Sequence, residues 1–226
     1  MIPLHRLEGF SDAVFAFAVT LLVVSLEVPK SATELFGAMR GFAAFGICFL
    51  FLGLIWVEHG QFFKRFPITD PLTVALNMLL LFVLLLYVYP LKFFFSVLSE
   101  QLLWGQSGHS IDSMAQARGL MIIYGLGFLT LNIVLIAMRL NARRQMQRRE
   151  PGGLHGADVV ALRGDLVRNA LQGGVALASV LIAATTQDDG RLSGPIYALL
   201  LPVSLGVRIY KRRLQHRLGV TERAAR

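Results

Sequence analysis

Charged residues and prolines are scarce in this 226-residue sequence, and cysteine occurs only once. Charged residues make up 16% and hydrophobic residues 55%, whereas an ordinary soluble domain has about 25% charged and roughly 45–50% apolar residues. This balance excludes a disordered chain and a soluble nucleic-acid-binding protein. The lone Cys48 lies in an apolar run, so it allows neither an intrachain disulfide nor a cysteine-based metal site. With 16 Phe and 8 Pro, the composition favours packed apolar helices.

The sequence also lacks the short motifs of common enzyme classes. It contains no glycine-rich phosphate-binding loop, no His-Glu-x-x-His metal motif, no Gly-x-Ser-x-Gly elbow and no Cys-x-x-Cys pair. We therefore predict that the chain is not an enzyme. We also expect no catalytic residues, no metal site and no organic cofactor.

Six uncharged runs are the main feature that is present. They occupy residues 13–26, 41–57, 71–91, 119–138, 169–187 and 192–207. A transmembrane helix needs about 17–25 residues, so the first run is long enough only if it begins near Gly9, which brings Asp12 to membrane depth. We predict an all-α integral membrane protein whose 226 residues form a single domain of six transmembrane helices. The expected helices lie at about 9–28, 35–58, 71–95, 116–139, 166–187 and 192–210.

Basic residues are distributed unequally between the two sides of this arrangement. With six spans, 17 of the 22 Lys and Arg fall on the side that holds both termini. The positive-inside rule places that side in the cytoplasm, so we expect a multi-pass protein of the cell membrane with both termini cytoplasmic. Residues 211–226 then form a basic cytoplasmic tail. The net charge of +8 thus reflects orientation and attraction to the lipid bilayer, with no nucleic-acid partner expected.

A few polar residues lie within the predicted membrane depth, where ionisable groups are costly and each suggests a functional site. Under this topology Arg6, Ser11, Asp12, His59 and Asn77 lie near the same leaflet. A buried carboxylate needs partners, so the first interpretation is a hydrogen-bonded brace that joins helices 1, 2 and 3. The second interpretation is a proton relay or an ion ligand.

The opposite face of the first helix is apolar. At 100° per residue, Phe10, Phe17, Leu21 and Val24 form a narrow stripe away from Asp12, with Thr20 at its edge. By periodicity alone, this stripe fits a lipid-facing or core surface most simply. A hydrophobic constriction in a pore is the alternative.

The start of the first helix carries a specific pattern, Arg6-x-x-x-Phe10-Ser11-Asp12. It resembles the Arg-x-x-x-Phe-Ser-Asp signature of the transmembrane protein 175 family, which comprises endolysosomal and prokaryotic potassium channels. The resemblance covers roughly residues 6–90. It is supported by further residues at Trp56, His59, Asp70, Asn77 and Pro90.

The resemblance implies a six-helix protomer that assembles as a homotetramer, with helix 1 lining a central pore. It places the pore constriction at Phe17, Leu21 and Val24 and a pore hydroxyl at Thr20, without a carbonyl selectivity filter. It also implies that signature and neighbouring residues brace helix 1. These are Arg6, Phe10, Ser11, Asp12, Trp56, His59 and Asn77.

Two positions depart from the family's pattern, because the first constriction residue is usually a branched aliphatic and the third a leucine. Here they are Phe17 and Val24. The leading hypothesis is a potassium-permeable cation channel that can also pass other monovalent cations or protons. One alternative is a proton channel or proton-coupled transporter that uses Asp12 and His59. Another is a membrane scaffold that conducts nothing.

Overall fold

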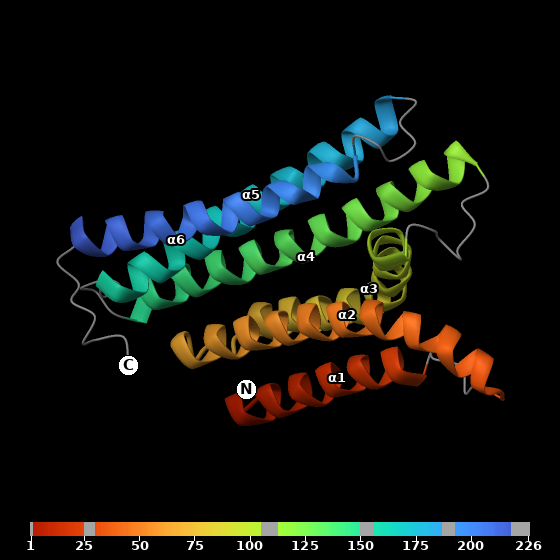
Figure 1. Ribbon diagram of the computed structural model, residues 1–226. Helices are drawn as coiled ribbons and strands as arrows, with labels where there is room; N and C mark the ends of the chain where they lie inside the picture. The colour runs from red at the N-terminus through yellow and green to blue at the C-terminus, as the bar shows by residue number, and fades with distance from the viewer. Residues whose placement is uncertain (1, 25–29, 105–112, 150–155, 187–192, 218–226) are drawn as a thin grey trace. The chain divides into compact units, whose positions relative to one another are not determined.

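The computed structural model describes residues 2–24, 30–104, 113–149, 156–186 and 193–217, and the predicted all-α class is confirmed within these ranges (Figure 1). The elements in chain order are α1 (Leu4–Val24), α2 (Ala32–Arg65), α3 (Pro71–Trp104), α4 (Met114–Arg149), α5 (Gly156–Thr185), the 3-10 helix η1 (Pro195–Leu199) and α6 (Leu200–Arg217).

Most helices extend beyond the bounds that the uncharged runs predict. α4 continues ten residues past 139, and α5 begins ten residues before 166. Hydropathy marks the part of a helix that can cross a membrane, whereas Arg and Lys are good helix formers outside it. The basic segment between the fourth and fifth runs is therefore mostly helical. The first predicted helix ends at 28, in a part of the chain outside the described residues.

Five of the described helices are long and apolar enough to cross a membrane. They are α1, α2 from Gly41, α3 up to Glu100, α4 from Ala115 to Arg148, and α5. The sixth predicted span, 192–210, is divided between η1 and α6. α6 then continues into the basic region that was expected to be a tail, as far as Arg217.

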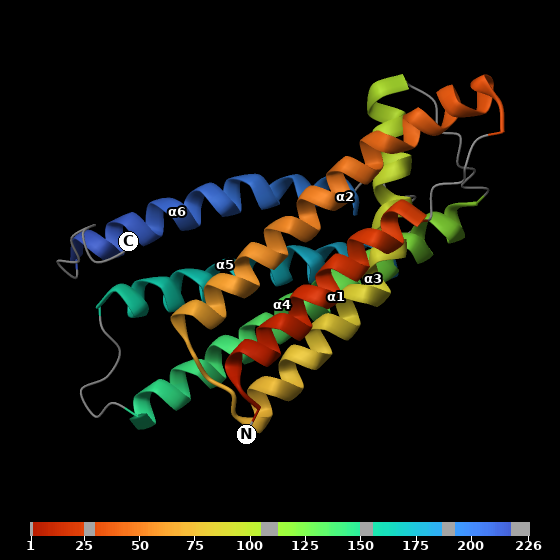
Figure 2. The ribbon, with the colours of Figure 1, turned by 90° about the horizontal axis from the view of Figure 1, so that it is seen from below.

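Contacts divide the chain into two compact units. The first contains α1, α2 and α3 from Leu81 onward, and α1 packs along α2 within it. The second contains the first part of α3, up to Leu80, together with α4, α5, η1 and α6. Within it, α5 packs along α4 and α6, as both ribbon views show (Figures 1 and 2), and it also contacts η1.

A close approach between α4 and α5 depends on a glycine. A Cβ atom added at Gly125 would collide with the Val180 side chain, so only glycine permits this contact. The surrounding Tyr-Gly-Leu-Gly-Phe segment is helical throughout. Gly125 therefore serves the packing of α4 against α5.

Candidate functional site: the α1 stripe and its bracing

α1 buries one face against its own unit. The buried residues recur at intervals of three and four positions, which places them along one side of a helix. They are Leu7, Ser11, Phe15, Ala18 and Leu22. The small Ala18 lies at the centre of this face and is fully buried.

The signature carboxylate makes a specific contact with α2. The Trp56 indole Nε1 donates a hydrogen bond of 2.7 Å to Asp12 Oδ1. Both residues are exposed, so the bond lies at the edge of the α1–α2 contact. An indole N–H is a donor only, so it fixes the carboxylate without accepting a proton from it.

The neighbouring signature residues have other environments. The Ser11 hydroxyl is buried and donates to the Leu7 carbonyl at 2.8 Å, a bond within α1. Arg6 and Phe10 are exposed. Asn77 is fully buried, but it belongs to the second compact unit.

His59 lies among aromatic rings. It is buried, with its ring edge-on to Phe15 of α1 at a centroid distance of 5.6 Å and to Phe63 at 4.9 Å. Edge-to-face aromatic pairs contribute roughly 0.5–1.5 kcal/mol beyond their buried area. His59 therefore packs between α1 and α2, next to the buried face of α1.

The apolar stripe of α1 lies on a different side from the buried face. Phe17 is 55% exposed and Val24 72% exposed, while Leu21 is half-buried. On a helical wheel this stripe is centred roughly 110° from the buried face. The stripe is therefore left open by the packing of α1 on its own unit.

Thr20 lies at the edge of this stripe and is exposed. Its hydroxyl donates to the Ala16 carbonyl at 2.9 Å, one turn earlier in α1. A hydroxyl has one hydrogen and two lone pairs. With the hydrogen used inside the helix, the oxygen presents acceptor lone pairs outward.

A second polar cluster, in the other unit, was not anticipated as a site. Asp70 caps the N-terminus of α3, where it accepts from the Thr73 hydroxyl at 2.6 Å. The Asn141 amide of α4 donates to both carboxylate oxygens, at 3.1 and 3.0 Å.

Burial raises the pKa of Asp70, but these hydrogen bonds outweigh it and hold the pKa below its ordinary value of 3.8. The Asp-Pro pair at the start of α3 is a cap signal in the sequence, but its Asn141 partner is distant in the chain.

An ionic cluster in the same unit joins three helices. The Asp165 carboxylate of α5 lies 2.7 Å from Lys211 Nζ of α6 and 3.7 Å from Arg139 Nε of α4. Arg168 contributes a third cation at 3.6 Å. Sequence reasoning missed Asp165 because it lies outside the uncharged runs, although its i, i+3 spacing to Arg168 is a visible signal.

The arrangement offers no clustered metal ligands. In the part of the chain that the structure describes, no group of three or more His, Cys, Asp or Glu side chains could hold a metal ion. The stripe of α1 offers apolar side chains, with the Thr20 hydroxyl at its edge.

The sequence of this chain was compared with known protein families and proteins. Residues 6–90 match the family described as the endosomal/lysosomal potassium channel TMEM175. A potassium channel of Marivirga tractuosa is 34% identical over 213 residues, which cover 88% of this chain and 84% of that protein. A potassium channel of Streptomyces collinus is 37% identical over 91 residues, or 38% of this chain and 44% of that protein.

Solved structures agree. A variant of the potassium channel MtTMEM175, crystallised with a Nanobody-MBP fusion protein, superposes with a TM-score of 0.78 at 33% identity, over 92% of this chain and 93% of that one. A TMEM175 homolog from Chamaesiphon minutus shares the fold, with a TM-score of 0.60 at 24% identity over 90% and 97% of the two chains. These relatives are channels, which confirms the prediction that the chain is not an enzyme. The resemblance drawn from the signature is confirmed as well, and the chain belongs to the TMEM175 family.

Proposed function

We propose that this chain is one subunit of a potassium-permeable cation channel in which four copies surround a central pore lined by α1. Its relatives over nearly the whole chain are named potassium channels. A single helix cannot enclose a pore, and closed rotational symmetry is the usual way for identical chains to surround one. Each copy would supply one α1.

The open stripe on α1 is the observation that carries this proposal. Phe17 and Val24 are exposed while the other side of the helix is buried in its own unit. In the tetramer, these residues and Leu21 would form apolar rings around the axis. Such rings exclude water when narrow and conduct when they widen.

Thr20 would supply the polar element beside these rings. Its hydrogen is donated to Ala16, so four outward hydroxyl oxygens could replace part of an ion's hydration shell. One ring of hydroxyls offers no cage of carbonyl oxygens, so we expect moderate selectivity for potassium.

We further propose six membrane crossings per subunit, with η1 and α6 forming the last, and both termini in the cytoplasm of a cell-membrane protein. This orientation is supported by the location of 17 of the 22 basic residues on that side. Potassium and, to a lesser degree, other monovalent cations are the expected permeant species.

The proton-pathway alternative fits the geometry less well. A relay needs groups that both give and accept protons, but Asp12 is held by the donor-only indole of Trp56. His59 is packed edge-on against Phe15 and Phe63. We assign Asp12, Trp56 and His59 to bracing α1.

The test is ion flux through purified protein in liposomes with a potassium gradient, with potassium, sodium or a bulky organic cation outside. Leu21→Ala should raise the flux by shortening the side chain in a constriction.

Thr20→Val should change the ratio of potassium flux to sodium flux. Thr130→Val is the matched control, because the Thr130 hydroxyl of α4 makes the same one-turn bond, to Leu126 at 2.7 Å. Absence of flux from folded wild type and Leu21→Ala alike would refute the channel.

A further inference from the structure

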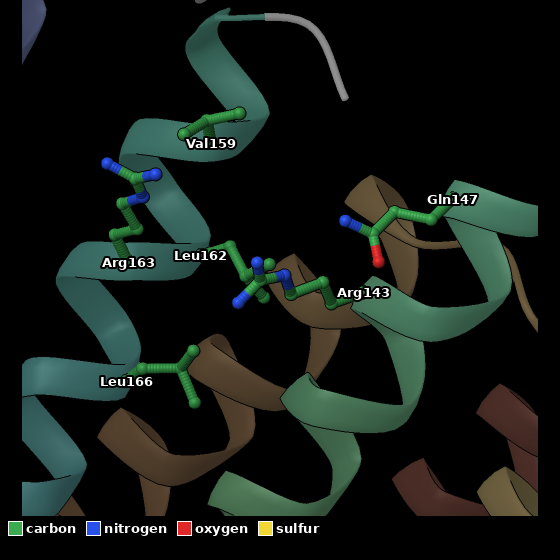
Figure 3. A pocket seen from close by; sticks show the side chains of 6 residues that line it. All are labelled: Arg143, Gln147, Val159, Leu162, Arg163 and Leu166. Atoms are coloured by element: carbon green, nitrogen blue, oxygen red, sulfur yellow. The ribbon is translucent and has the colours of Figure 1, made fainter. Parts of the chain in front are cut away.

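A pocket of about 140 Å³ lies between α4 and α5 (Figure 3). The close-up shows Arg143 and Gln147 extending from α4 toward α5, and Leu162 and Leu166 on the facing side of α5. Val159 and Arg163 complete the lining. The volume is below the roughly 300 Å³ at which sites for drug-sized ligands begin, so the pocket suits a small group.

Two arginines give this pocket a positive charge. Arg143 and Arg163 are exposed, and neither forms an ion pair within the described residues. Of the two carboxylates on α5, Asp158 precedes the lining residue Val159 and Asp165 already faces three cations, so the surroundings of the pocket stay net positive. An anion is the complementary ligand.

The depth of the pocket in a membrane follows from helix geometry. The apolar run of α4 ends at Met138, and that of α5 begins at Asn169. At 1.5 Å per residue, Arg143 lies roughly 7–8 Å beyond the run and Leu166 roughly 4–5 Å. Headgroup layers extend about 5–8 Å beyond each side of the hydrocarbon core. Leu166 therefore lies nearer the core and Arg143 at the level of the lipid phosphates, while Leu162 lies roughly 10–11 Å beyond the run.

We propose that this pocket binds the phosphate group of an anionic membrane phospholipid. Arg143 donates to the phosphate oxygens with help from the Gln147 amide, Arg163 adds positive potential, and the Leu166 side chain contacts the first segments of the acyl chains. A zwitterionic lipid carries its own cation beside the phosphate and is bound less well. The proposal concerns lipid binding and does not depend on ion conduction.

The experiment counts lipids bound to the purified full-length protein by native mass spectrometry. Phosphatidylglycerol and phosphatidylcholine with identical acyl chains are compared at equal concentration. Arg143→Gln should weaken phosphatidylglycerol binding about fivefold, from the contribution of one arginine at a lipid surface. Arg144→Gln is the matched control, because Arg144 is exposed and adjacent but does not line the pocket. It should leave the affinity within twofold of wild type.

Two outcomes would overturn the proposal. Equal losses in Arg143→Gln and Arg144→Gln would mean diffuse attraction to the basic end of α4. Displacement of the lipid by inorganic phosphate or glycerol phosphate at similar concentration would mean a site for a soluble phosphate. A thermal unfolding curve for each variant, expected to match wild type, ensures that lost binding reports the pocket and not the fold.

Discussion

α1 and α5 are both long apolar helices, but they are attached to their neighbours in different ways. α1 packs on α2, where Phe15 contacts the His59 ring, with a hydrogen bond from Trp56 at the edge. α5 is tied to α4 and α6 by ion pairs that converge on Asp165.

This difference in attachment distinguishes a fixed helix from one that can shift, although both have similar hydropathy. Charge pairs with a buried partner tolerate little displacement, because moving one leaves the other desolvated and unpaired. Apolar contacts are non-directional and tolerate small shifts. We interpret the α4–α5–α6 group as a fixed scaffold and α1 as the element that can shift to widen a pore.

The largest expected loss of stability is in the scaffold of α4, α5 and α6. Asp165→Asn would remove the negative charge that Asp165 places beside Arg139, which is only 3% exposed. Loss of one member of a buried ion pair costs about 3 kcal/mol of stability, which thermal unfolding in detergent would measure. Asp158→Asn, in the first turn of the same helix, should cost less than about 1 kcal/mol. Equal losses of stability in Asp165→Asn and Asp158→Asn would contradict a special role for the ion pairs at Asp165.

The next largest effect on stability is expected from two glycines of α4. Gly125→Ala places a Cβ against Val180 and should destabilise the protein by roughly 1–3 kcal/mol. Gly119→Ala, where a Cβ meets nothing within 4 Å, should be neutral or stabilise by up to about 1 kcal/mol. Thermal unfolding of the two variants distinguishes close packing from helix propensity. Equal stabilities would contradict the close approach of α4 and α5.

A smaller effect depends on pH. The pKa of Asp70 is lowered in the folded protein, so its stabilising contribution is present above the ordinary pKa of 3.8 and is lost as pH falls through the lower folded value. Asp70→Asn keeps an acceptor oxygen at the cap but loses the charge, so it should cost about 1 kcal/mol at pH 7, and the gap to wild type should close below about pH 4. Unfolding temperatures across this pH range test it. A gap that stays constant with pH would exclude the charged form as the cause.

The smallest effect on stability belongs to α1. Trp56→Phe removes the donor to Asp12 and should cost no more than about 1 kcal/mol, because the bond is exposed. If the bond positions a pore helix, flux should change although the unfolding temperature barely does. A loss of stability as large as that of Asp165→Asn would make α1 part of the rigid scaffold.

The sequence identified the helices and the apolar stripe because both depend on local periodicity. Residues Phe17, Leu21 and Val24 share one side of a helix whatever surrounds it, and Asp12 required a partner because of its cost at membrane depth. The predicted bounds were too short, because uncharged runs measure membrane crossing and not helix formation.

The partners could not be predicted from the sequence. Asp12 bonds to Trp56, 44 residues away, and Asp70 to Asn141, 71 residues away. No local spacing encodes such pairs, since they depend on how separate helices pack. The fit of Gly125 against Val180 has the same origin.

The claim that the α1 stripe lines a pore is tested most directly by two adjacent valines. Val24 lies on the stripe and is 72% exposed, while Val23 is 48% exposed and points roughly 100° away. Val→Thr keeps the shape and replaces a methyl by a hydroxyl, which makes an apolar ring easier to wet. In the liposome assay, Val24→Thr should raise potassium flux and Val23→Thr should leave it unchanged. Equal flux in the two folded variants would contradict a pore on this face of α1.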